Sequence, residues 1–190
     1  MKTYKLLRLI RGKLYPLYVN ANQEMPTCQW IDAEVGQLAD ENHVRSRLGP
    51  LALRPGFHSC EVPFTDWIGR KGGDGKLYQR QGTVWCECEV DGNRLQVNER
   101  RGLRTIPQGW YYFRTKPGQL FPWVISGSIL IRRILRRSEV EALCDANGVQ
   151  AQPMWTEKGG NICRINQKDP AAIPDARDSV NRARCFAGNT

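Results

Sequence analysis

The chain has 190 residues, with 41% hydrophobic and 25% charged side chains, which is close to the composition of an average globular domain. This length falls within the range of a single domain and is enough to bury a sizeable hydrophobic core. Because no stretch of about 18 consecutive apolar residues occurs, we expect no membrane-spanning segment. Basic residues interrupt the apolar residues near the N-terminus, so we also expect no signal peptide.

The charge balance is strongly basic. Lysine and arginine number 28 against 19 aspartates and glutamates, which gives a formal net charge of +9. Such a charge attracts nucleic acid, acidic protein or an anionic membrane surface, and it does not distinguish among them. The seven cysteines are an odd number without an export signal, so we expect free thiols and a cytoplasmic protein.

The N-terminal part of the chain predicts one hairpin followed by loops. Residues 3–19 alternate around an Arg11-Gly12-Lys13 turn, which is typical of two paired strands. Residues 20–50 are polar and have little sustained period, so we expect loops around one buried anchor, Trp30. Residues 51–54 predict a short strand that ends at a Pro-Gly turn.

The second half of the chain carries the better marked elements. The glycine-rich residues 69–75 predict a flexible hairpin tip or loop and lack the spacing of a phosphate-binding loop. Residues 83–90 alternate cleanly before an Asp-Gly turn, and residues 110–114 and 123–135 predict two more strands. The clearest helix is expected at residues 139–147.

This helix has recognisable start and stop signals. Ser138 is the expected N-cap, Glu141 completes a capping box, and Gly148 follows at the stop position. Its narrow apolar stripe favours packing on the edge of a sheet. The fold class is therefore α+β, with a mainly antiparallel sheet of about five to seven strands and one clear C-terminal helix. We expect residues 1–150 to form one globular domain and residues 151–190 an extended, irregular tail or arm.

The strongest functional signal is a basic region that contains no acidic residue. Its members are Arg100, Arg101, Arg104, Arg114, Lys116, Arg132, Arg133, Arg136 and Arg137. Aromatic residues such as Tyr111 and Phe113 interleave with them. Arginine binds phosphate bidentately and exposed aromatics stack on unpaired bases, so the region favours single-stranded nucleic acid or RNA. The alternative is that the aromatics belong to the core and the arginines form a solvated face.

Within this region we expect the last four arginines, from position 132 onward, to make the contact with the anionic partner. Strand alternation would place them on two faces, so both pairs cannot point inward. We therefore expect at least two of these guanidinium groups to be free in solvent for phosphate or carboxylate.

The chain has only two histidines, which leaves few residues for acid–base catalysis. His58 is close in sequence to Cys60 and Glu61, and these three are weak catalytic candidates, with Cys60 as the nucleophile and His58 as its base. A set of possible zinc ligands is His58, Cys60, Cys86 and Cys88. Because the usual two-residue gap between cysteines is absent, we expect no metal. The simplest interpretation is that the His58 ring ties down the preceding Pro-Gly turn while Cys60 packs inward.

A resemblance covers about half of the chain, from residue 51 to residue 148. Residues 54–63 contain Gly-Phe-His-Ser-Cys-Glu and residues 84–90 read Val-Trp-Cys-Glu-Cys-Glu-Val. These runs resemble a Gly-Phe-His-x-Cys-Glu core seen in uncharacterised phage and mobile-element proteins, and residues 123–127 and the helix start at 138–141 are similar too. The resemblance implies a phage or mobile-element origin, and a location in the cytoplasm of a bacterial host, more than it implies any activity.

The order of these elements is also similar to that of compact ADP-ribosyltransferase folds. Those enzymes hold NAD with an Arg or His on an early strand and often use a late Glu to activate the acceptor or the ribose. The resemblance implies that Arg8 plays the first part and that NAD is the cofactor. The strand expected at residues 124–135 contains no Glu, which departs from the family pattern.

These observations give one leading hypothesis and two alternatives. The leading hypothesis is a phage or mobile-element accessory protein of the defence-inhibitor type, which binds nucleic acid or an acidic host protein or nucleoprotein through the basic region and needs no cofactor. The alternatives are an ADP-ribosyltransferase-like enzyme that uses NAD and a small nuclease in which His58 takes part. A binding protein shows salt-sensitive binding and leaves its partner unchanged, whereas an enzyme alters it.

Overall fold

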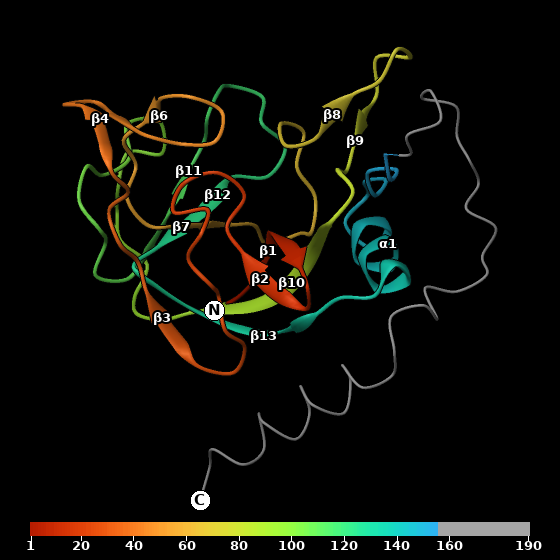
Figure 1. Cartoon of the computed structure of the whole chain (residues 1–190), viewed down its shortest axis with the longest axis horizontal. Coiled ribbons are helices and arrows are strands. Elements are labelled where there is room, and N and C mark those ends of the chain that lie inside the picture. Colours follow the sequence, from red (N-terminus) through yellow and green to blue (C-terminus); the bar gives the residue numbers. More distant parts are fainter. Residues whose placement is uncertain (156–190) are drawn as a thin grey trace, which may run out of the picture.

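The computed structural model describes residues 1–155, which form thirteen strands and one helix (Figure 1). Their bounds are β1 Lys2–Ile10, β2 Lys13–Tyr15, β3 Trp30–Asp32, β4 Leu38–Asp40, β5 His43–Val44, β6 Leu51–Ala52, β7 Phe57–Ser59, β8 Arg70–Lys71, β9 Leu77–Tyr78, β10 Thr83–Val90, β11 Trp110–Phe113, β12 Trp123–Ser126, β13 Ser128–Ile134 and α1 Arg137–Asp145. The paired strands are antiparallel, so the expected α+β fold class is confirmed. Most of the expected tail lies outside the described residues.

The central element is a five-stranded sheet with the order β2-β1-β10-β13-β3. β1 and β2 form the predicted hairpin, whose turn has positive φ angles of 49° at Arg11 and 82° at Gly12. β1 also pairs with β10 along most of its length, and its partners run from Lys2–Glu89 to Arg8–Thr83. Because side chains alternate along both strands, the sheet presents two apolar faces, and each requires a cover.

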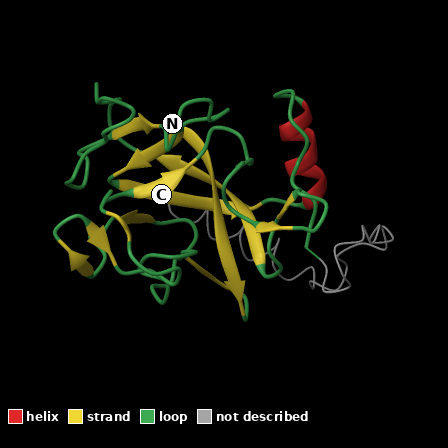
Figure 2. Cartoon of the chain, turned by 90° about the horizontal axis from the view of Figure 1, so that it is seen from above, coloured by secondary structure: helices red, strands yellow, loops and turns green. Residues whose placement is uncertain are grey.

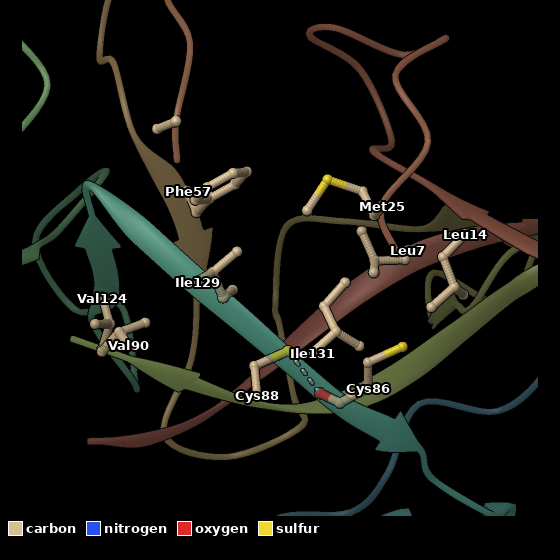
Figure 3. Close-up of a cluster of buried hydrophobic side chains, with 11 residues drawn as sticks. Leu7, Leu14, Met25, Phe57, Cys86, Cys88, Val90, Val124, Ile129 and Ile131 are labelled. Carbon is tan, nitrogen blue, oxygen red and sulfur yellow. Dashed lines mark hydrogen bonds between the residues drawn. The ribbon is translucent and has the colours of Figure 1, made fainter. Parts of the chain in front are cut away.

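A three-stranded sheet with the order β11-β12-β7 covers one of these faces. Leu7 and Cys86 of the central sheet pack with Phe57 of β7 and Val124 of β12 (Figure 3). The backbone that follows β7 also joins β1, because the Cys60 amide and carbonyl both hydrogen-bond to Tyr4. The two sheets therefore enclose one continuous apolar layer.

The helix α1 lies beside the strands of the central sheet (Figure 2). Its buried residues Val140 and Cys144 pack in one cluster with Leu6 of β1 and Trp85 of β10. The expected packing of this helix on the edge of the sheet stays a prediction. The helix also begins earlier than predicted, at Arg137.

The cap of α1 explains this earlier start. Arg136 rather than Ser138 is the N-cap residue, and its backbone amide donates a hydrogen bond of 2.7 Å to the Glu139 carboxylate. Glu139 thus occupies the third helical position and satisfies a backbone donor that has no partner within the helix. Gly148 follows the helix with a φ of 71°, as its predicted stop position requires.

The strand predicted at residues 123–135 is two strands that belong to different sheets. β12 ends at Ser126 in the small sheet and β13 begins at Ser128 in the central sheet. The chain changes sheets at Gly127, where a Cβ atom would lie 2.0 Å from the Pro107 carbonyl oxygen. Only glycine permits this approach of two backbone segments.

The segment at residues 20–50 has a different anchor from the one expected. Trp30 lies on the edge strand β3 and is 49% exposed, whereas Met25 is 1% exposed and packs in the main core. The prediction that Trp30 is the buried anchor is therefore wrong. Met25 is unbranched and fills the space next to Leu14, to which its backbone also bonds.

Four cysteines of the described region are free and buried, namely Cys60, Cys86, Cys88 and Cys144. Cys28 is disulfide-bonded, so the expectation that all seven thiols are free is wrong at that position. In the described part of the chain, α1 is too short and too polar to cross a membrane.

Candidate functional site: an arginine-lined cavity beside β1

Arg132 and Arg133, two members of the predicted basic region, form ion pairs with glutamates. Arg132 donates two hydrogen bonds of 2.9 Å to the Glu89 carboxylate. Arg133 contacts the carboxylates of Glu87 at 2.9 Å and Glu139 at 2.6 Å. These contacts neutralise both guanidinium groups on the surface of the central sheet.

A β-bulge brings these two arginines to the same side. β10 and β13 shift register between Glu87 and Cys88, so that Glu87 pairs with Arg133 while Cys88 pairs with Ile131. Arg132 is the extra residue, and the bulge cancels the strict alternation that would send it to the other face. The alternation expected from the sequence is therefore wrong at this point of the sheet.

The third of these arginines is also held by protein groups. The Arg137 Nε donates to the Glu141 carboxylate at 2.7 Å, and its Nη1 donates to the Gln152 carbonyl at 2.8 Å. Arg136 is the N-cap of α1. These guanidinium groups reach solvent, as expected, since the side chains of Arg132 and Arg133 are 41% and 43% exposed. Carboxylates engage three of the four groups, so the expectation that such groups are free for a ligand is wrong at Arg132, Arg133 and Arg137.

Two more members of the basic region serve to hold loops. Arg114 contacts Glu99 at 3.0 Å and donates to the Gln119 carbonyl at 2.7 Å. Arg104 donates to the Glu41 carbonyl, which lies far away in sequence. These side chains therefore have structural partners, which accounts for their positions without a ligand.

The remaining members are exposed but separate from the arginines of β13. Arg100 and Arg101 lie at a turn, with no side-chain partner among the described residues. The Lys116 ammonium lies 3.4 Å from the centroid of the Trp67 ring, and Trp67 is 37% exposed. These three residues keep charge that a polyanion can reach.

The two aromatics assigned to the binding surface belong to the core. Tyr111 is 0% exposed and Phe113 is 2% exposed, so neither can stack on a base, and their assignment to the surface is wrong. The Tyr111 hydroxyl accepts a hydrogen bond of 3.1 Å from the Leu103 amide, and Arg54 lies over the Phe113 ring. These two aromatics belong to the core, as the alternative interpretation of the basic region expects.

His58 and Cys60 lie in the structural arrangement that the sequence favours. The His58 Nδ1 lies 3.3 Å from the Gly56 carbonyl, at the predicted turn, and Cys60 is 3% exposed. Desolvation, the nearby Lys5 ammonium and Arg54 together lower the pKa of His58 to about 4. The ring is thus neutral at physiological pH and ties the backbone before β7.

A pH-dependent stability effect follows from this histidine. An unfolded histidine titrates near pH 6.5, so between pH 6.5 and about 4 the unfolded chain binds the extra proton and stability falls as the pH falls. We expect His58→Ala to lower the free energy of unfolding by about 1 to 2 kcal/mol at pH 7. This deficit should shrink toward pH 4.5 in urea titrations.

His43→Ala is the control, since it removes a histidine side chain that is 44% exposed and pairs with the exposed Asp40 carboxylate. We expect it to change stability by less than about 0.5 kcal/mol. A deficit in His58→Ala that stays constant from pH 7 to pH 4.5 would contradict the neutral, desolvated state of the ring.

The thiols near His58 have the properties of core side chains. Burial raises the pKa of Cys60 and of Cys86 well above the usual range and raises the pKa of Cys88 to about 12. Glu61 is exposed and accepts a hydrogen bond of 2.7 Å from the Tyr112 hydroxyl. Among the described residues, no group of three His, Cys, Asp or Glu side chains is arranged to hold a metal ion.

Arg8, the residue singled out for NAD, lies at a cavity of about 340 Å³. Four segments form it: the end of β1, residues 17–18, residues 47–48, and the base of the β8–β9 hairpin with the turn before β10. Its charged side chains are those of Arg8, Arg47 and Arg80, and its polar side chains are those of Tyr18, Gln81 and Thr83. The described residues that line the cavity include no aspartate or glutamate.

Backbone carbonyls hold Arg8 in place. Its Nε donates to the Pro16 carbonyl at 2.9 Å, and its Nη2 donates to the Ala21 carbonyl. Its guanidinium carbon also lies 5.8 Å from the centroid of the Tyr15 ring. A guanidinium group has five N–H donors, so Arg8 keeps donors for a ligand while its orientation is fixed in advance.

The other two arginines approach the cavity from loops. The Arg47 amide donates to the Tyr18 carbonyl, which anchors the loop while the exposed Arg47 side chain has no hydrogen-bond partner in the described region. The Arg80 Nε lies 3.4 Å from the Gly69 carbonyl across the base of the hairpin. Desolvation and the charge of Arg47 lower the pKa of Arg8, which indicates like charges that an anion would relieve.

The β8–β9 hairpin extends the positive charge beyond the cavity. Residues 69–80 contain Arg70, Lys71, Lys76 and Arg80 against a single acidic residue, Asp74. The Asp74 carboxylate accepts a hydrogen bond of 2.8 Å from the Tyr78 hydroxyl. Figure 1 shows this hairpin projecting from the sheets. The basic residues of the cavity and of the hairpin are here called the hairpin strip, which is defined by Arg8, Arg47, Arg70, Lys71, Lys76 and Arg80.

Sequence reasoning identified only one member of the hairpin strip. Arg8 was selected through a family resemblance, whereas Arg47 and Arg80 lie in loops with no motif. The sequence contained one usable signal, the excess of basic residues around the glycines at 69–75. That stretch lacks a phosphate-binding-loop spacing, so only the fold connects it to Arg8.

Comparison with known proteins found no matching family model, no matching curated protein and no matching solved structure. The resemblances to phage proteins and to ADP-ribosyltransferases therefore stay predictions. The functional argument rests on the geometry of the cavity and of the hairpin strip.

Proposed function

We propose that the protein binds single-stranded nucleic acid along the hairpin strip, with the cavity beside β1 as its centre. The observation that carries the proposal is that three arginines line one cavity whose described lining has no carboxylate. Elsewhere, Arg132, Arg133 and Arg137 are neutralised by glutamates. The net charge of +9 supports a polyanionic partner.

The size and chemistry of the cavity favour a single strand over a duplex. A volume of about 340 Å³ admits one nucleotide unit but no double helix. Apolar side chains also line the cavity, and Ile10 and Leu48 are 43% and 55% exposed at its edge. Unpaired bases have free faces for such contacts, whereas the bases of a duplex are stacked on each other.

Paired charge reversals test this assignment. We expect Arg47→Glu combined with Arg80→Glu to weaken binding of a labelled 20-nucleotide single strand by about tenfold or more at 100 mM salt. The slope of log affinity against log salt should flatten by about 1.4, because each phosphate contact contributes about 0.7 for single strands. Fluorescence anisotropy between 50 and 300 mM salt measures both quantities.

The matched control is Arg100→Glu combined with Arg101→Glu, which changes the net charge equally at another exposed site. We expect this pair to lower affinity by less than about threefold through the general field alone. Circular dichroism checks that each variant is folded. If the control pair weakens binding more than the cavity pair, the predicted basic region is the interface and the hairpin strip is not.

The transferase alternative keeps one supporting observation, since Arg8 lines a cavity with further anion-binding groups. No acidic residue among the described lining residues is available to activate an acceptor. Incubation with NAD and a protein acceptor, followed by mass spectrometry, separates the two functions. The leading proposal expects intact NAD, and release of nicotinamide would establish the alternative. The phage or mobile-element origin, the role as a defence inhibitor and the small-nuclease alternative stay predictions.

A further inference from the structure

The lining of the cavity beside β1 combines two chemically different sets of side chains, here called the cationic wall and the apolar wall. Arg8, Arg47 and Arg80 supply the cationic wall. The apolar wall consists of Leu6, Leu9, Ile10, Leu17, Leu48 and Ile68. A ligand that contacts both walls carries concentrated negative charge next to an apolar, flat body.

We propose that the cavity binds one nucleotide, with a phosphate monoester among the three guanidinium groups and the base against the apolar wall. This inference rests on the proposed function and specifies which part of the nucleic acid the cavity takes. The same chemistry has two sources: the phosphorylated terminal nucleotide of a strand, or a free nucleoside monophosphate.

Charge matching favours a monoester over an internal phosphodiester. A phosphate monoester carries about −1.5 to −2 at neutral pH and has three oxygens for hydrogen bonds, whereas an internal phosphodiester carries a single negative charge. Arg8 and Arg47 are close enough for the charge of Arg47 to lower the pKa of Arg8. Two such groups are best neutralised by a doubly charged anion.

Arg8 and Tyr18 are the polar groups that we expect to bind the phosphate. Arg8 is fixed by its bonds to the Pro16 and Ala21 carbonyls, so it loses little side-chain entropy on binding. The Tyr18 hydroxyl is desolvated, which raises its pKa, and the positive charge of Arg80 acts on it. A phosphate oxygen that accepts from Tyr18 therefore satisfies a hydroxyl that is partly desolvated.

Competition with matched oligonucleotides tests the inference on the full-length protein. The displaced probe is a labelled, unphosphorylated single strand, and the competitors are one sequence with a 5′-phosphate, a 3′-phosphate or neither. We expect at least one phosphorylated form to compete about fivefold better than the unphosphorylated form. Equal competition by all three forms would contradict the terminal-phosphate source.

Small ligands test the second source and separate the two walls. We expect adenosine 5′-monophosphate to protect the protein against thermal unfolding at millimolar concentration and adenosine to give no shift. Arg47→Glu should abolish the shift, whereas Lys116→Glu, a charge reversal away from the described lining of the cavity, should retain it. Leu48→Ser should weaken binding of the nucleotide by about threefold. It should leave unchanged the smaller thermal shift that inorganic phosphate causes.

The outcomes separate this inference from the function on which it rests. If single strands bind with the expected salt slope but neither a terminal phosphate nor the monophosphate has an effect, the single-nucleotide inference is wrong and the proposed function stands. If the monophosphate binds through Arg47 and single strands do not bind, the inference stands with the free nucleotide as ligand and the proposed function is wrong. An effect of Leu48→Ser on inorganic phosphate would contradict the assigned base wall.

Discussion

Gly127→Ala is expected to destabilise the protein by at least about 3 kcal/mol, because the new methyl group collides with backbone rather than with a movable side chain. A Cβ at this position would lie 2.0 Å from the Pro107 carbonyl oxygen. The backbone there is fixed from both sides, since Gly127 donates to the Gly109 carbonyl and accepts from the Ala33 amide. Relief of the collision therefore requires the loop that contains Pro107 to move away from the junction between β12 and β13.

Chemical denaturation of the wild type and of Gly127→Ala measures this effect, and failure to obtain folded protein is its extreme form. Gly73→Ala is the matched control, because no atom lies within 4 Å of its Cβ position. We expect the control to change the free energy of unfolding by less than about 0.5 kcal/mol. Near-wild-type stability of Gly127→Ala would show that the junction between β12 and β13 is looser than described.

Lys5→Met is expected to stabilise the protein by about 2 to 3 kcal/mol at pH 7, since it removes a desolvated charge from between the two sheets. Lys5 lies between the fully buried Thr3 and Leu7 on β1, opposite Cys86. Its ammonium donates to the His58 carbonyl at 2.7 Å, yet desolvation lowers the pKa of Lys5 to about 8. Methionine keeps the length of the side chain without the charge.

The pH dependence identifies the cause. Between pH 8 and 10.5 the unfolded chain holds the lysine proton that the folded chain has released, so the Lys5 contribution to stability rises with pH. The advantage of Lys5→Met should therefore shrink from pH 7 to pH 9 in urea titrations. Above pH 9 the buried thiols act in the opposite direction, because burial raises the pKa of groups such as Cys88 to about 12.

Lys71→Met is the control for loss of a lysine, since Lys71 is exposed on the β8–β9 hairpin. We expect it to alter stability by less than about 0.5 kcal/mol, with no trend from pH 7 to pH 9. Equal stability of Lys5→Met and the wild type at pH 7 would mean that the Lys5 ammonium remains hydrated.

The position of Lys5 also illustrates how the core tolerates a polar residue. One hydrogen bond to the His58 carbonyl and the nearby Phe57 ring, 5.6 Å from the ammonium, offset part of the desolvation cost. The same ammonium helps to keep His58 neutral. The two sheets are therefore joined by a polar contact between β1 and β7 as well as by apolar packing.

Local patterns in the sequence determined the elements with a strong period or a marked turn. β10 matches the predicted strand at residues 83–90, because strict alternation specifies which side chains face the core. The β1–β2 hairpin follows from its Arg-Gly turn, which needs positive φ angles. The α+β class and the single helix follow from these same local signals.

Contacts between residues distant in sequence decided the exposure of Trp30 and the start of α1. Trp30 is exposed because its strand forms the edge of the central sheet, and edge position depends on topology rather than on residue type. The helix begins at Arg137 because the Glu139 carboxylate is shared between the Arg136 amide and Arg133 of β13. A capping pattern read along the chain contains no information about that second contact.

The same distinction applies to the candidate site. The sequence by itself determined that the protein is basic and that Arg8 lies at the end of an early strand. Only the tertiary structure brought Arg47 and Arg80 to Arg8, and only the bulge beside Cys88 placed Arg132 and Arg133 against glutamates of β10. The physical reason is that neutralisation of a charge depends on distance in space, which pairing between strands and loops sets, whereas composition fixes only the total charge.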